Sequence, residues 1–72
     1  MKIITEYKNN EEIIEIFNTL KEVKESCLGW IEVYEDIDNK NYKSEKGIIS
    51  QSDDLNSINH VMSYFGYSYK SN

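Results

Sequence analysis

The fold prediction depends most on residues 11–27, whose sequence is EEIIEIFNTLKEVKESC. At about 100° per residue, the apolar side chains of this stretch fall in one arc of a helix and most carboxylates fall in a second arc almost opposite. The apolar arc contains Ile13, Ile16, Phe17, Leu20, Val23 and Cys27. Asn9 and Asn10 precede it as N-cap candidates, and the first carboxylates suit the positive end of a helix dipole. The stretch therefore predicts an amphipathic helix with an acidic outer ridge.

Five further segments are predicted around this helix from hydrophobic periodicity and turn residues. They are a strand over residues 2–7, a strand over 30–37, a strand over 42–50, a helix that begins at Ser52 or Asp53 and ends before Gly66, and a short strand over 67–70. The turn-rich residues 36–41 would join the second and third strands in a hairpin.

This order of elements, β-α-β-β-α with a closing β, predicts one small α+β domain over residues 1–72. It matches a ferredoxin-like sandwich, with two helices on one face of an antiparallel sheet. The polar residues 42–46 do not suit the central strand of that sandwich. A three-stranded meander with both helices on one sheet face is therefore the alternative.

Composition indicates the kind of organism and the cellular compartment in which the protein is expected. Proline, alanine and arginine are absent while isoleucine, asparagine, lysine and tyrosine are abundant, which indicates an AT-rich bacterium or a phage or mobile element within one. Cys27 is the single cysteine, so no intramolecular disulfide can form. The first residues lack the apolar stretch of a signal peptide, and no apolar run is long enough to span a membrane. A cytoplasmic protein is expected.

Charge is concentrated in residues 11–38. This segment holds nine acidic residues and two lysines, a net charge of −7 within a chain whose net charge is −5. Phosphate would be repelled by such a protein, and the arginine that usually recognises it is missing. Direct binding of nucleic acid is therefore disfavoured.

No pattern predicts catalysis, a metal or a cofactor. Cys27 and His60 are the only soft ligands, whereas metal sites usually need three or four ligands. A nucleophilic pair of these two residues would lack a third group to orient it. The carboxylates lie on a predicted solvated ridge, where burial cannot shift their pKa values. We therefore expect a protein that is not an enzyme.

Two sets of residues are the candidates for partner binding. The first is the carboxylate ridge and its continuation into the predicted hairpin, and the second is a pair of aromatic residues on the open sheet face, where aromatic side chains often anchor interfaces. Together they are Glu11, Glu15, Glu22, Glu25, Trp30, Glu32, Tyr34, Asp36 and Asp38. The same carboxylates could equally serve solubility or protect an edge strand.

The sequence therefore predicts a small acidic protein-binding module whose acidic face docks on a basic, nucleic-acid-binding surface of another protein. By analogy of composition, phage and mobile-element inhibitors of the anti-CRISPR, anti-restriction and nuclease-immunity kinds act in this way, as mimics of nucleic acid. One alternative is a structural or regulatory subunit that forms a homodimer or larger oligomer through the open sheet face. A third is a small carrier that uses Cys27 and His60.

Overall fold

The computed structural model describes residues 3–72 and contains one three-stranded sheet and three α-helices. In chain order the elements are β1 (Ile4–Lys8), β2 (Glu12–Phe17), α1 (Leu20–Asp38), α2 (Lys43–Gln51), α3 (Leu55–Met62), the 3₁₀-helix η1 (Ser63–Phe65) and β3 (Tyr67–Ser71). The α+β class is confirmed. The order is β-β-α-α-α-β, so the split β-α-β order of a ferredoxin-like sandwich is not formed.

The first correction concerns residues 11–17, which form the hairpin partner of β1 instead of the start of a helix. Asn9 and Asn10 have φ values of 55° and 62°, and the N–H of Glu11 donates to the carbonyl of Lys8 at 3.1 Å. Two consecutive positive φ values are typical of the type I′ turn that joins short hairpins. Asn9 and Asn10 are therefore turn residues, not helix caps. The isoleucines that follow are β-branched and suit a strand.

The helix α1 begins at Leu20, nine residues later than the predicted start at residue 11, and it opens with an N-terminal capping box. The Thr19 side chain accepts a hydrogen bond from the Glu22 N–H, and the Glu22 carboxylate accepts one from the Thr19 N–H. The sequence signal Thr-x-x-Glu is present at these positions. At the other end, Asn39 adopts the left-handed conformation with φ 51° and ends the helix.

The strands predicted over 30–37 and 42–50 are both wrong, because these residues lie in α1 and α2. Val23, Cys27 and Ile31 follow one another at intervals of four and are all fully buried, which defines a helical stripe. The polar start of α2 is exposed or half-buried, and Ile49 is its buried anchor. The turn residues predicted at 36–41 form the end of α1 and the connection to α2.

The remaining predictions hold with small shifts. β1 and β3 match the predicted strands, with Lys2 lying outside the described residues. The second predicted helix is α3, and its N-cap is Asp54, which accepts the Ser57 N–H at 2.8 Å, instead of Ser52 or Asp53. Gly66 ends η1 as expected. Its φ is 87°, a conformation that strains any residue other than glycine, and a Cβ there would also require the Asn9 side chain to move.

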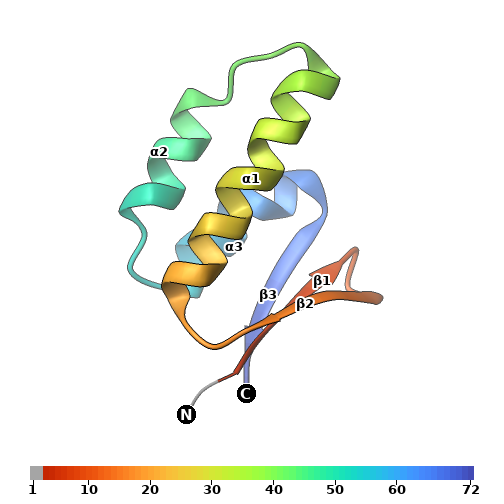
Figure 1. Ribbon diagram of the computed structural model, residues 1–72, viewed down its shortest axis with the longest axis vertical. Coiled ribbons are helices and arrows are strands. Elements are labelled where there is room, and N and C mark those ends of the chain that lie inside the picture. Colours follow the sequence, from red (N-terminus) through yellow and green to blue (C-terminus); the bar gives the residue numbers. More distant parts are fainter. Residues whose placement is uncertain (1–2) are drawn as a thin grey trace.

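The sheet has the order β2-β1-β3, and both pairs of strands are antiparallel. The helices lie on one side of it: α1 and α3 pack against the sheet, and α2 packs against these two helices. In Figure 1, α1 and β2 lie nearer to the viewer than α3 and β3. The core fills the space between the helices and the sheet. Its buried apolar members are Ile4, Phe17, Val23, Cys27, Ile31, Tyr42, Ile49, Ile58, Val61, Met62, Phe65, Tyr67 and Tyr69.

Candidate partner-binding surface

The predicted carboxylates do not form one continuous ridge, because the predicted helix is divided between two elements. Glu11 lies in the β1–β2 turn and Glu15 on β2, whereas Glu22, Glu25, Glu32, Asp36 and Asp38 lie on α1. The expectation that Glu11 and Glu15 continue the ridge of the first helix is therefore wrong. The acidic residues form two groups, one along β2 and one along α1.

The group on α1 lies beside an exposed apolar stripe. Glu25, Glu32 and Asp36 are exposed on the side of α1 opposite its buried stripe. Beside them run Gly29, Val33 and Ile37 at intervals of four, and the latter two side chains are 46% and 69% exposed. A shallow open groove is lined by Gly29, Glu32, Val33, Glu35, Asp36 and Ile37. We call Glu25, Gly29, Glu32, Val33, Asp36 and Ile37 the outer face of α1.

The carboxylates of this face form no ion pair within the described part of the chain. Over residues 3–72, the one ion pair joins Lys46 to Glu35 at 3.0 Å. Lys24, which is also on α1, donates to the carbonyl of Ser52 at 3.0 Å. The outer face of α1 therefore presents negative charge to solvent.

Gly29 lowers the stability of α1, and no packing contact requires a glycine at this position. No heavy atom lies within 4 Å of the place where its Cβ would be. Glycine in an exposed helix interior is about 1 kcal/mol less favourable than alanine. Gly29→Ala should therefore raise the free energy of unfolding by about 0.5–1 kcal/mol, measured by urea denaturation. A loss of stability would contradict the open environment described here.

Two further acidic residues of α1, Glu22 and Asp38, have structural partners. Glu22 belongs to the capping box, and its carboxylate also accepts the Asn18 N–H at 3.1 Å. Asp38 accepts a hydrogen bond from the Tyr42 hydroxyl at 2.6 Å. These hydrogen bonds stabilise the fold, so Glu22 and Asp38, which the sequence places among the partner-binding residues, have a structural role.

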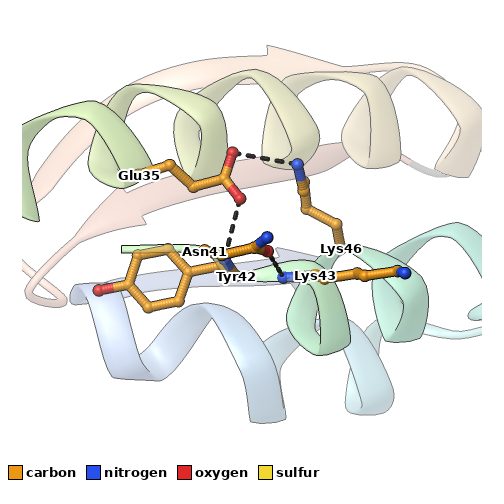
Figure 2. A network of polar contacts seen from close by, with 5 residues as sticks. All are labelled: Glu35, Asn41, Tyr42, Lys43 and Lys46. Carbon is orange, nitrogen blue, oxygen red and sulfur yellow. Dashed lines mark hydrogen bonds and ion pairs between the residues drawn. The ribbon is translucent and has the colours of Figure 1, made fainter. Parts of the chain in front are cut away.

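Glu35 holds the connection between α1 and α2, as Figure 2 shows. One carboxylate oxygen accepts the backbone N–H of Tyr42 at 2.8 Å, and the other accepts from Lys46 at 3.0 Å. These two donors hold the pKa of Glu35 below its ordinary value. In the same connection the Asn41 side chain accepts the Lys43 N–H at 2.8 Å, which starts α2. The network leaves Glu35 unavailable to a partner.

The aromatic candidates lie between the helices and the sheet, so their predicted place on the open sheet face is wrong. The Trp30 ring stacks on Tyr67 with centroids 5.2 Å apart, and the Tyr34 ring stacks on Phe65 at 5.0 Å. Lys8 lies beneath them, with its ammonium 4.3 Å from the Tyr67 ring centroid and hydrogen-bonded to the Phe65 carbonyl. Because α1 is a helix throughout, these half-buried rings pack against the core instead of projecting from a strand.

The open sheet face carries different apolar residues, which the sequence placed in the core. Tyr7 pairs with Ile13 and Thr5 pairs with Ile16 across β1 and β2, so all four share one face. The isoleucines are 59% and 57% exposed. A hairpin signal at Asn9–Asn10 could have revealed this, because it turns Ile13 and Ile16 away from a helix stripe.

Glu6 is a buried carboxylate that sequence reasoning did not single out. Its side chain accepts a hydrogen bond from the Tyr69 hydroxyl, while its Oε1 atom has no partner in the described structure. Burial raises the pKa of Glu6, and the Tyr69 hydroxyl and the Trp30 indole only partly oppose that shift. The native state therefore binds the Glu6 proton more tightly than the unfolded chain does.

The raised pKa of Glu6 predicts that the free energy of unfolding falls as pH rises through and above the ordinary pKa of glutamic acid. In this range the unfolded chain releases the proton freely, whereas the native state must either ionise Glu6 in the core or keep it protonated. Glu6→Gln removes this titration. The variant should match the wild type near pH 4 and exceed its free energy of unfolding by about 1 kcal/mol at pH 8. Urea denaturation at a series of pH values checks this. A difference that shrinks as pH rises would contradict it.

Cys27 and His60 are not brought together into a site. Cys27 is fully buried, and burial raises the pKa of its thiol to about 12, which opposes formation of a thiolate. His60 is exposed on α3. Within residues 3–72, no group of three or more His, Cys, Asp and Glu side chains is arranged to hold a metal ion. No helix of this part of the chain has the length and apolar character needed to cross a membrane.

Comparison with known proteins gives no assignment: no family model, no curated protein and no solved structure matches this chain. Function must therefore be argued from the surface itself.

Proposed function

We propose that this protein is a non-enzymatic binding module whose outer face of α1 docks on a basic surface of another protein. The observation that carries the proposal is the combination of three exposed carboxylates, Glu25, Glu32 and Asp36, with an exposed apolar stripe beside them. Carboxylates without cations attract a basic partner and steer its approach. The apolar stripe supplies the area that is removed from water once the partner has docked.

A nucleic-acid-binding surface is the kind of basic surface that we propose as the target. Glu25 and Asp36 are 11 residues apart in one helix, which places them about 16 Å apart along its axis. Phosphates of one DNA strand follow one another every 3.4 Å or so along a duplex, so several phosphates occupy the same length. A rigid row of carboxylates of this length can replace them against lysine and arginine side chains. The protein would then act as an inhibitor, encoded by a phage or mobile element and acting in the bacterial cytoplasm.

Competition with DNA tests this function. The immobilised protein is used to capture targets from an extract of the source cell, and the bound fraction is then washed with a short DNA duplex at constant ionic strength. We expect the duplex to release the target, because both ligands would occupy one basic surface. The purified target should also lose DNA binding when the protein is added in about equal amount. A complex that contains target, DNA and this protein together would contradict the proposal.

A further inference from the structure

The strand β2 is an edge strand whose outer side is bare. It pairs with β1 alone, and every residue from Glu12 to Ile16 is exposed. Among the hydrogen bonds formed within residues 3–72, none outside the β1 pairing involves the backbone of β2. Figure 1 shows β2 along the near edge of the sheet, with no segment beside it on its outer side. Unpaired N–H and C=O groups on such an edge are a template for another strand.

The opposite edge of the sheet, β3, is covered at its centre by a side chain of α3. The Asn59 side chain from α3 accepts the N–H of Tyr69 at 2.7 Å and donates to the carbonyl of Tyr69 at 2.9 Å. The Ser68 hydroxyl is also bonded to Asn10 at 3.0 Å. A side-chain amide thus forms hydrogen bonds with the outward-facing backbone groups at the centre of β3. Within the described residues, no side chain does the same for β2.

The two faces of the β2 edge differ in chemistry. On the open face, Ile13 and Ile16 are opposite Tyr7 and Thr5 of β1. On the helix-covered side, Glu12 is opposite Lys8 and Glu15 is opposite the buried Glu6. Ile14 is left unpaired at a β-bulge in β2, and as a result Ile13 and Ile16, three residues apart, lie on one face. An added strand would therefore meet apolar side chains on one face and carboxylates on the other.

We propose that the outer edge of β2 accepts an extended segment of a partner protein in which basic residues alternate with β-branched residues. Main-chain hydrogen bonds to β2 would provide affinity, and the alternating side chains would provide specificity. The β-branched residues would pack against Ile13 and Ile16, and the basic residues would face Glu12 and Glu15. This surface is distinct from the outer face of α1, so the proposal extends beyond the proposed function and does not depend on it.

A second copy of the chain is the less suitable occupant on two grounds. Pairing β2 with itself would bring Glu12 and Glu15 of both copies close together, in a protein whose net charge is already −5. The open face is also small: three strands of about five residues give roughly 240 Å², well below the roughly 800 Å² per partner of a standard interface. The carboxylates thus oppose self-pairing and favour a basic strand.

The test uses the heptapeptide Lys-Val-Lys-Val-Lys-Val-Lys as the probe, with the ¹⁵N-labelled protein observed by NMR. We expect amide signals of β2 to shift most and its amides to exchange more slowly with solvent in the complex. The matched peptide with glutamate in place of lysine should bind at least tenfold more weakly. Glu12→Gln/Glu15→Gln should weaken the lysine peptide at least threefold, whereas Glu25→Gln/Glu32→Gln, which removes the same charge from α1, should leave its affinity within about twofold.

Main-chain pairing is separated from simple charge attraction by two N-methylated forms of the same peptide. Alternate N–H groups of an extended strand point to opposite sides, so methylation of the valines and methylation of the inner lysines block opposite edges. One of the two forms should lose at least tenfold in affinity and the other should retain most of it. Equal affinities for the unmethylated peptide and both methylated forms would overturn the proposal. So would signal shifts confined to α1, or a dimer of the free protein at 0.15 M salt with β2 amides protected, which would assign the edge to a second copy.

Discussion

Replacing Ile31 with alanine should cost about 3 kcal/mol of unfolding free energy, whereas Val33→Ala and Ile37→Ala should each change it by less than about 0.5 kcal/mol. Ile31 is fully buried in the core stripe of α1, and its truncation leaves a cavity. Val33 and Ile37 are exposed on the outer face, where alanine is also the better helix former. A chain of 72 residues has on the order of 4–11 kcal/mol of stability, so the Ile31 variant would be close to unfolding.

The three variants together separate the two assignments of residues 30–37. In a half-buried strand, residues 31, 33 and 37 would point the same way and all three truncations would be costly. In the helix only the truncation of Ile31 should be costly. Urea denaturation followed by circular dichroism measures all three on the same scale. Three similar losses would contradict the helical assignment of α1 in this region.

The parts of the fold that could be predicted are those in which local signals are complete within a few residues. β1 has an alternating β-branched pattern, α3 has its apolar spacing and an acidic cap within one residue of the prediction, and Gly66 ends η1. The packing of helices on one side of the sheet also follows, because the apolar faces of the helices and of the sheet must be buried against each other. None of these depends on a distant partner.

The elements that differ from the prediction share one ambiguity in their sequence pattern. Residues 13–17 fit a helical stripe and a bulged strand equally well, and only the Asn9–Asn10 turn and the capping box of Thr19 decide between them. Once the helix begins at Leu20, it continues through Gly29, since an exposed glycine weakens a helix without ending it. Residues 30–37 therefore follow the helical period of α1, although their apolar residues also alternate as in a strand.

The candidate site was predictable in charge and not in placement. Glu25, Glu32 and Asp36 are exposed and outward-facing whether their segment is a helix or a strand, so their exposure does not depend on the element that carries them. Trp30 and Tyr34 depend on the element that carries them, and in α1 they turn toward the core. The bare edge of β2 depends on the absence of a third neighbour, which only the assembled sheet reveals.

The largest functional effect is expected from reversing the charge of the outer face of α1. Glu25→Lys/Glu32→Lys changes the net charge by four and places lysines where the basic partner would approach. Glu11→Lys/Glu45→Lys changes the net charge equally at positions outside α1, in the β1–β2 turn and on α2, and serves as the matched control. We expect the first variant to associate with the captured target at least tenfold more slowly than the wild type, since like charges repel at the point of contact.

The most direct test of the proposed function is the association rate of the captured target with the wild type and both variants, measured between 0.05 and 0.5 M salt. The wild-type rate should fall at least tenfold over this range, because salt screens the attraction between exposed charges. The Glu25→Lys/Glu32→Lys variant should be slow throughout and nearly independent of salt, while the control stays within about threefold of the wild type. Equal slowing of both variants, or no slowing of either, would contradict docking through the outer face of α1.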